Sequence, residues 1–503
     1  MPASRRRTDP LTPLLGVVSL VVFWLHGFAS YLSRDLSLYT YAGQHVLDGV
    51  PPYVAVLNRA GPLAHLLPAA GIAGARAVGR ADLLGARVFY LLLAVGCVCL
   101  VHVVGRDVYG SRLAGLVSAT AFLTFLGFIE YAADGPREKT PMVLFGLCSL
   151  WALAHRRWGW AGLSLGLATL TLQLAFFVGA PVLVVCLAWA PRRVRALALT
   201  VVGGAVPVLV LAVYFAWQGA LHDAVDGFLL LNLRDTSANP MVPHLAADWS
   251  LLRTGYGLSL YVLVGGLVAW LAVSPAAVLA VRRDRSAGAA LRVGLGVSAV
   301  AGVLWTLHDF DSWPDVFELL PVAALGVGGA FAAVRARLSP RAASLALPLA
   351  LAWALAATAF AGVSSVTRRD HRLDEQRSAV AAALAVLPRA RMASLNAPQP
   401  LVLSGRTNPT RYQMFISGLD RYVDETWPGG LHGFTASLLR EHPQLVAVGT
   451  PSRAWMRHAL RDDYTVVGAP PGWVWYAARS LGPDVLGRLR AGQPQPTPDS
   501  GTG

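Results

Sequence analysis

Residues 5–35 read RRRTDPLTPLLGVVSLVVFWLHGFASYLSRD, which is three arginines, an apolar run over about 11–32 and then Arg34-Asp35. The run matches the roughly 20 apolar residues that span a bilayer. No small-residue cleavage site follows it, so we expect a retained first helix rather than a signal peptide. Because basic residues stay in the cytoplasm, the N-terminus is predicted inside and Asp35 outside.

The remaining loops alternate in charge along the chain. Basic loops include 106–112, 156–157, 192–195, 282–285 and 335–341, whereas the carboxylates gather around 35–48, 130–138, 223–248 and 309–318. This alternation favours a multi-pass membrane protein whose acidic loops all lie outside.

Composition supports the same class. The chain has 503 residues, of which 55% are hydrophobic and 14% charged, and its mean hydropathy is +0.51. A soluble domain carries about 25% charged residues. The net charge of +14 is explained by cytoplasmic loops facing anionic lipid head groups, so membrane lipids and not nucleic acid are the expected partners.

Eleven spans are predicted, which places the C-terminus outside. The stretch 158–190 is too long for one span, and splitting it near Gln173 keeps every later arginine loop inside. The predicted spans are 11–32, 84–105, 111–130, 140–155, 158–173, 175–190, 196–216, 256–281, 288–306, 316–334 and 342–363.

Two outer loops are long, and a separate domain follows the last span. The first loop, 33–83, carries two amphipathic stretches, 35–47 and 62–78, that are typical of interfacial helices. The second covers 217–255. Residues 364–483 are predicted to form a small extracytoplasmic α/β domain, and 484–503 a disordered tail. The expected strands of the α/β domain are Leu401–Ser404, Leu445–Val448, Tyr464–Val467 and Trp473–Tyr476, with a hairpin turn at 470–472.

The first outer loop carries two candidate functional elements. Asp35 at the mouth of the first helix would stay ionised and is a candidate general base or metal ligand; the alternative is a simple helix cap. Arg59, beside an apolar helix, suits a lipid phosphate, although an ordinary contact with phospholipid head groups is the alternative. Arg34 and Tyr53 are candidate substrate contacts.

Two further loops add polar candidates. Residues 130–139 hold five charges, and we expect Asp134 and Arg137 to belong to a site, Lys139 to help bind phosphate and Glu138 to form salt bridges. His308 and Asp309 begin an acidic corner around Phe310 that suits a sugar or a metal, or is a solvated turn. No specific metal is indicated, and a divalent cation is one possibility. The four cysteines lie in apolar runs without zinc-ligand spacing.

These elements together resemble the GT-C superfamily of integral membrane glycosyltransferases, the group related to protein O-mannosyltransferases and aminoarabinose transferases, in its actinobacterial form. The matching elements are Asp35, Tyr41-Ala42, Gly49-Val50-Pro51-Pro52-Tyr53, Arg59-Ala60-Gly61-Pro62, Asp134, Leu170-Thr171-Leu172-Gln173 and Glu318-Leu319-Leu320-Pro321. Two positions depart from the family pattern. Arg34 replaces one acid of the usual acidic pair, and Leu172 stands where a lysine is expected.

The resemblance implies a bacterial plasma-membrane enzyme that uses a polyprenyl-phosphate-linked sugar. The acceptor would be a hydroxyl on a glycan, lipid or protein. Asp35 and Asp134 would then be catalytic, with Arg59, Arg137 and Lys139 on the donor phosphate and Arg34, Tyr53, His308 and Asp309 on the acceptor side. A transporter or lipid flippase, or a non-catalytic scaffold for envelope assembly, is the alternative. No Walker loop, dinucleotide-binding glycine motif or Gly-x-Ser-x-Gly elbow is present.

Overall fold

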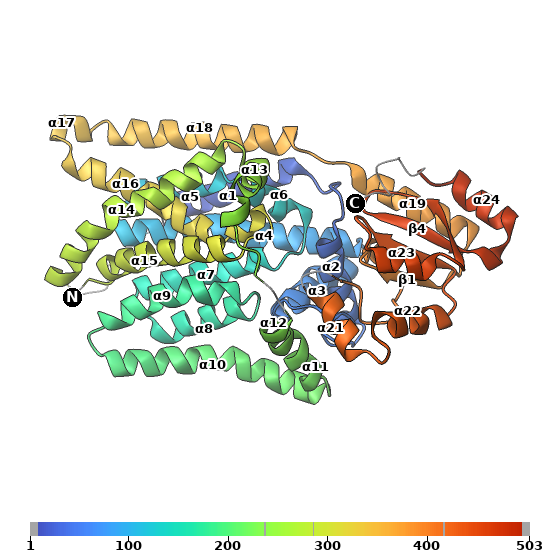
Figure 1. Cartoon of the computed structure of the whole chain (residues 1–503). Helices are drawn as coiled ribbons and strands as arrows, with labels where there is room; N and C mark the ends of the chain where they lie inside the picture. The colour runs from blue at the N-terminus through green and yellow to red at the C-terminus, as the bar shows by residue number, and fades with distance from the viewer. Residues whose placement is uncertain (1–8, 236–237, 285, 416–417, 495–503) are drawn as a thin grey trace.

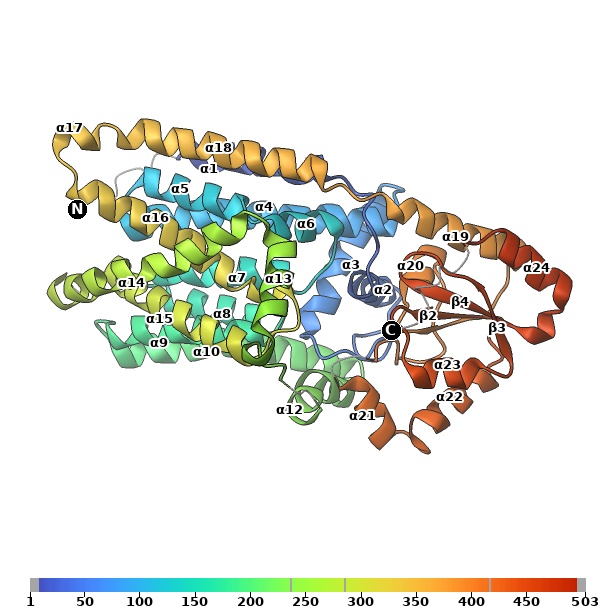
Figure 2. The same cartoon turned by 45° about the horizontal axis from the view of Figure 1, so that its top comes forward.

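The computed structural model describes residues 9–235, 238–284, 286–415 and 418–494 (Figure 1). A long helical bundle forms one part of the molecule, and a smaller α/β domain projects from one end of it (Figure 2). The bundle helices are α1 (Leu11–His26), α4 (Asp82–Tyr109), α5 (Arg112–Leu123), α6 (Leu126–Asp134), α7 (Lys139–Ala154), α8 (Trp158–Thr169), α9 (Leu174–Ala188), α10 (Arg193–Trp217), α14 (Ser259–Asp284), α15 (Ala287–His308), α16 (Leu319–Arg337), α17 (Pro340–Ala343) and α18 (Ala346–Thr367).

Every predicted span coincides with a helix or helix pair, but the helices are not all long enough to cross a bilayer. In the described residues, six are long and apolar enough, or seven if the bent pair α5–α6 counts as one span. The predicted count of eleven exceeds this number. Helices α1, α7 and α9 are shorter apolar helices of 16, 16 and 15 residues.

Two predicted boundaries need correction at the end of the bundle nearest the C-terminal domain. The first helix ends at His26, because Gly27 takes a left-handed φ of 85°, and residues 27–33 run as a non-helical segment. The span predicted over 111–130 breaks after Leu123, and α6 turns 68° away from α5. Both changes take polar residues out of the apolar helices and bring them together at this end of the bundle. The predicted break near Gln173 is confirmed, since α8 ends at Thr169 and α9 begins at Leu174.

Small residues allow the apolar helices to approach closely. A Cβ added at Gly203 of α10 would lie 2.0 Å from the carbonyl oxygen of Gly159 in α8. Where lipid surrounds a bundle, such close backbone contact supplies the packing that holds helices together.

The two long loops that were predicted to lie outside fold into short helices. The first loop forms α2 (Arg34–Leu47) and α3 (Pro62–Ala77), as predicted. Helix α2 begins where the Ser33 hydroxyl accepts a hydrogen bond from Leu36 N, which fixes Asp35 in the first turn. The second loop contains α11 (Leu221–Val225), a π-helical turn (Asp226–Leu230), α12 (Leu231–Arg234), a 3-10 turn (Val242–His244) and α13 (Leu245–Tyr256); a further 3-10 turn covers Trp313–Val316.

The C-terminal domain has a four-stranded mixed sheet in the order β1-β2-β4-β3. Strands β1 and β2 are parallel, and β4 is antiparallel to both β2 and β3. Its elements are α19 (Arg372–Val386), β1 (Met392–Leu395), α20 (Gln399–Ser404), α21 (Leu419–Thr426), α22 (Gly430–Arg440), β2 (Leu445–Gly449), α23 (Ala454–Leu460), β3 (Tyr464–Gly468), β4 (Trp473–Ala478), a 3-10 turn (Arg479–Leu481) and α24 (Pro483–Ala491).

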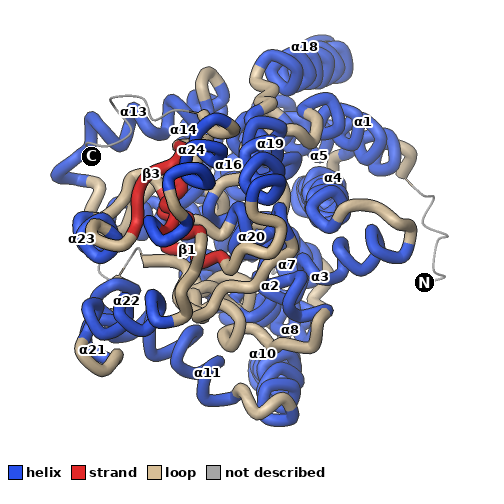
Figure 3. The backbone as a smooth tube through the Cα atoms, turned by 90° about the vertical axis from the view of Figure 1, so that its right-hand side faces the viewer, coloured by secondary structure: helices blue, strands red, loops and turns tan. Residues whose placement is uncertain are grey.

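Helices cover both faces of this sheet (Figure 3). Alternate residues of β2 show the division. Leu445 and Ala447 belong to the core shared with α19, α20 and α24, whereas Val446 and Val448 belong to the core shared with α21, α22 and α23. Successive side chains of a strand point to opposite faces, so each apolar strand contributes to two cores.

Three strands and the turn at 470–472 are confirmed, but two predictions for this domain were wrong. Leu401–Ser404 lies in helix α20, because Pro400 occupies the helix start and Gly405 closes the helix in the left-handed conformation. The first strand is instead Met392–Leu395. The tail predicted as disordered from 484 begins with helix α24, and its Leu489 is buried in the domain core. Residues 495–503 lie outside the described residues.

Candidate active site

A polar cavity of about 480 Å³ lies where the bundle meets the C-terminal domain. Its volume falls in the range of small-molecule sites. Its walls come from four segments that are distant in sequence: the turn after α1 with the start of α2, the end of α6, the turn at 312–314 and the linker that precedes α19. The lining residues are His26, Ser30, Tyr31, Ser33, Asp35, Leu36, Glu130, Tyr131, Asp134, Arg137, Ser312, Trp313, Pro314, Arg368, Asp370 and Arg372.

Asp35 faces this cavity between two arginines. Its Oδ2 lies 3.1 Å from Arg137 Nη2, and its Oδ1 lies 3.3 Å from Nε of Arg34. Burial raises the pKa of Asp35, but the charges of Arg137 and then Arg34 outweigh burial and hold the pKa below its usual value. The side chain is 25% exposed, so an ionised carboxylate is open to a ligand in the cavity.

Asp134, the second carboxylate predicted to be catalytic, ends α6 and lines the same cavity. The Ser30 hydroxyl donates a hydrogen bond to its Oδ1, and Nε2 of His26 lies 3.6 Å from the same oxygen. Gly135 follows with a φ of 127°, a conformation open to glycine that turns the chain sharply after the helix. The fold thus brings together two carboxylates that are 99 residues apart in the sequence.

A buried arginine that sequence reasoning missed supports both carboxylates. Arg87 of α4 is almost fully buried and donates hydrogen bonds to the carbonyl oxygens of Phe28 and Ser30. The segment 27–33, which leads from α1 to Asp35, is therefore fixed by a cation from another helix. The signal in the sequence was an arginine inside an otherwise apolar run, and such residues usually have a partner or a function.

The linker before the C-terminal domain was also missed as part of the site. Arg368 Nη1 pairs with Glu130 Oε1 at 2.6 Å, and the Arg372 guanidinium lies 4.8 Å from the ring centre of Tyr31. Asp370 accepts a hydrogen bond from Tyr31 N at 3.2 Å. Further along, Gln376 of α19 bonds both the N–H and the carbonyl of Leu32. The C-terminal domain is therefore joined directly to the segment that carries Asp35.

The predicted phosphate-binding cations lie in different surroundings. Arg137 lines the cavity and stacks over Tyr131 with 4.5 Å to the ring centre. Lys139 is bonded to Asp315, whose other oxygen accepts from Asp311 N and Ser312 N at 2.8 Å. Lys139 is thus adjacent to the cavity through the turn at 311–315.

Arg59 does not line the cavity. Its Nη2 lies 3.7 Å from Asp311 Oδ2, in the same turn that holds Lys139. Its carbonyl oxygen accepts hydrogen bonds from the side-chain amides of Gln173 and Asn232, at 3.0 and 2.8 Å. Gln173, singled out in the sequence at a helix break, therefore holds the backbone of Arg59.

None of the four predicted acceptor residues lines the cavity. Tyr53 is fully buried and donates to the carbonyl oxygen of Ala60, so here it supports the first outer loop. His308 packs edge-on against Trp305, and Asp309 accepts from Asn239 N at 2.9 Å. Arg34 approaches the cavity only through its contact with Asp35. In the part of the chain that the structure describes, no three His, Cys, Asp or Glu side chains gather as a metal site.

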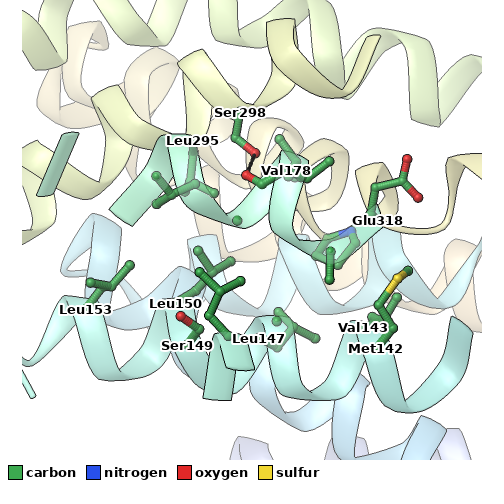
Figure 4. A pocket seen from close by; sticks show the side chains of 17 residues that line it. Met142, Val143, Leu147, Ser149, Leu150, Leu153, Val178, Leu295, Ser298 and Glu318 are labelled. Carbon is green, nitrogen blue, oxygen red and sulfur yellow. Dashed lines mark hydrogen bonds between the residues drawn. The ribbon is translucent and has the colours of Figure 1, made fainter. Parts of the chain in front are cut away.

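A second, apolar cavity of about 60 Å³ lies within the bundle between α7, α9, α15 and α16 (Figure 4). Ser298 donates to the carbonyl oxygen of Val178 at its wall. Glu318 stands at the end nearest Met142 and Val143 (Figure 4). Both of its carboxylate oxygens are buried, and neither has a hydrogen-bond partner among the described residues.

The fold and the polar cavity indicate a polytopic helical membrane protein with a C-terminal α/β domain that meets the bundle at a polar site. Searches of family models and of curated proteins gave no match. Among solved structures, the chain is similar to ArnT from Cupriavidus metallidurans. The form bound to undecaprenyl phosphate superposes with a TM-score of 0.59 at 15% identity, covering 95% of this chain and 100% of ArnT. The apo form gives 0.61 at 16% identity, with coverages of 94% and 99%. The similarity shows an ArnT-like fold, in agreement with the fold predicted from the sequence.

Proposed function

We propose that this chain is a membrane glycosyltransferase that moves a sugar from a polyprenyl-phosphate carrier to an acceptor hydroxyl outside the cytoplasm. The acceptor would belong to a glycan, a lipid or a protein of the cell envelope. One observation carries the proposal: Asp35 and Asp134 line a single cavity, beside Arg137, in a chain that shares its fold with ArnT over nearly its whole length. This favours a transferase over a transporter or a scaffold.

The cavity suits a sugar. Tyr31, Tyr131 and Trp313 supply aromatic surface, and the carboxylates supply acceptors for hydroxyl groups. The carrier is suggested by ArnT, which has been crystallised with undecaprenyl phosphate. A lipid carrier also fits the position of the cavity at the end of an apolar bundle, where a membrane-anchored donor would present its head group.

In the proposed reaction the acceptor oxygen attacks the anomeric carbon of the donor. The bond from that carbon to the phosphate oxygen breaks, and polyprenyl phosphate leaves with the electron pair. Asp35 takes the acceptor proton, and Asp134, steadied by Ser30 and His26, orients the acceptor. Arg137 stands beside Asp35 and offsets the charge that grows on the leaving phosphate.

Lys139 and Arg59 would extend the phosphate site along the turn at 311–315. Each is paired with a carboxylate of that turn, Asp315 and Asp311 respectively. An arriving phosphate would replace the weaker and more exposed partner, Asp311, on Arg59. Burial and the nearby Asp315 raise the pKa of Asp311. Asp311 is therefore the easier of the two carboxylates for a phosphate to displace from its cation.

The proposed location is the bacterial plasma membrane, with the basic loops in the cytoplasm and the C-terminal domain outside. Cysteine labelling tests this orientation. Asp48→Cys, on the exposed end of α2, should react with an impermeant maleimide added to intact cells, whereas Arg193→Cys at the start of α10 should react only after lysis. Labelling in the reverse pattern would refute the orientation.

The function itself is tested by comparing lipid extracts from cells that contain or lack the protein. Loss of a transferase leaves its donor unused, so mass spectrometry should find a polyprenyl-phosphate sugar that accumulates only in the deletion cells. The mass of that lipid would also identify the sugar class. Identical lipid extracts, with unchanged envelope glycans, would contradict the proposal.

A further inference from the structure

A groove of about 260 Å³ lies on the outside of the bundle between α5, α16 and α18, far from the candidate active site. Its walls are almost entirely apolar and include Val117, Phe331, Val334, Leu349 and Trp353. Helix α18 runs along the edge of the bundle and is joined to α16 through α17, at the end opposite the C-terminal domain (Figures 1 and 2).

The helix that forms the far wall of the groove is anchored to α5. The Trp353 indole donates to the carbonyl oxygen of Val117 at 3.3 Å. Helices α16 and α18 both belong to apolar segments long enough to cross a membrane. The groove therefore opens toward the hydrocarbon of the bilayer, where its occupant would be a lipid chain.

The end of the groove is basic. Arg335 lines it, Arg337 ends the same helix, and Arg341 follows in α17. All three are exposed, and none forms an ion pair within the described residues. The loop at 106–112 differs, since Arg106 and Arg112 both lie against Asp9. A phosphate at Arg335 would supply the missing counter-charge, in the bidentate geometry that guanidinium groups favour.

We propose that this groove is a binding site for one anionic glycerophospholipid, with an acyl chain between α16 and α18 and its phosphate on Arg335. Basic pockets between spanning helices are suited to anionic head groups. A zwitterionic lipid offers the same chains but adds an ammonium group that three unpaired arginines repel. The site does not depend on the proposed transferase activity.

Native mass spectrometry of the full chain in detergent tests the proposal, using phosphatidylglycerol and phosphatidylethanolamine with identical chains. The expected result is one phosphatidylglycerol adduct, retained at about 10-fold lower lipid concentration than phosphatidylethanolamine, which corresponds to about 1.4 kcal/mol. Arg335→Gln should remove this preference. Arg193→Gln, in a basic loop outside the groove, is the matched control and should retain it.

The acyl-chain part of the proposal has its own variants. Val334 and Leu349 are exposed residues of the groove wall, so Val334→Trp and Leu349→Trp fill it without disturbing the core. Each should weaken the adducts of both lipids. Equal retention of the two lipids by the wild type, an unchanged preference in Arg335→Gln, or unchanged adducts in both tryptophan variants would each overturn the proposal.

Discussion

Arg137 and Asp35 form an ion pair at 3.1 Å in the wall of the polar cavity, although 101 residues that include four complete helices separate them in the chain. The pair fixes the charge state of Asp35. Its pKa lies below the usual value, so Asp35 is ionised throughout the physiological range and becomes protonated only in acid.

Replacing Arg137 should therefore raise the pKa of Asp35. In Arg137→Gln, Arg34 still lowers the pKa of Asp35, but the larger opposing charge is gone and the effect of burial counts for more. The acid limb of the pH profile of sugar transfer should therefore move toward neutral pH. The stabilisation that this lowered pKa supplies is present above the unfolded pKa and is lost as pH falls through the folded one. An acid limb at the same pH in both proteins would show that Asp35 is not the group that titrates. Arg377→Gln, on the exposed face of α19, is the control.

Arg87 should be essential for the shape of the site. In Arg87→Met the carbonyl oxygens of Phe28 and Ser30 lose buried donors, at a cost of about 1–3 kcal/mol for each unsatisfied group. We expect a lower melting temperature. Arg80→Met, at an exposed position before the same helix, should melt like the wild type. Equal melting of both variants would remove Arg87 from its supporting role.

His65 predicts an acid sensitivity in the first outer loop. Its ring is fully buried between Tyr39 and Tyr53, neither nitrogen has a partner among the described residues, and burial lowers its pKa to about 3. The unfolded chain binds a proton on this histidine below about pH 6.5 while the folded chain does not. Stability should therefore fall as pH drops from about 6.5 toward 3.

His65→Phe should flatten that decline, as measured by melting temperature between pH 7 and about 4.5. His458→Phe, at an exposed position of α23, should leave it unchanged. Parallel pH dependences in His65→Phe and the wild type would contradict the assignment.

Glu130 and Arg368 couple the bundle to the linker of the C-terminal domain, with 2.6 Å between Oε1 and Nη1. Glu130→Gln and Arg368→Gln should each lower the melting temperature. Because both substitutions remove the same ion pair, the double variant should lose less free energy of unfolding than the two single variants added together. The difference, which is the coupling energy, should be about 0.5–3 kcal/mol. Strictly additive effects would show that the pair does not hold the linker.

Apolar periodicity and loop charge were sufficient to predict most of the architecture. The apolar runs, the two helices of the first outer loop and three strands of the C-terminal domain are where the sequence places them. Local signals that depend on single residues were harder to read. Gly27 ends α1 early, α6 bends away from α5, and Pro400 lies in the first turn of a helix where a strand was predicted.

The candidate site was predicted in part, for a physical reason. Asp35, Asp134 and Arg137 carried charge at the outer ends of apolar runs, where charge is costly unless it has a use. His26 and the linker at 368–372 reach the cavity only through tertiary contacts, and nothing in their local sequence shows which loop they face. Arg87 supports the cavity wall in the same way, from a different helix. The short helices α7, α8 and α9 likewise take their stability from packing that no single segment reveals.

The central claim is that Asp35 and Asp134 act on a lipid-linked sugar in the shared cavity. It is tested most directly by restoring Asp35→Asn, Asp134→Asn and Asp374→Asn separately to deletion cells and measuring the polyprenyl-phosphate sugar in lipid extracts. Asp374 is an exposed carboxylate on α19, away from the cavity. The account predicts that Asp374→Asn clears the accumulated donor, while both cavity variants, folded and present in the membrane, leave it in place with transfer reduced about 10²–10⁴-fold. Clearance of the donor by both cavity variants at the wild-type rate would contradict it.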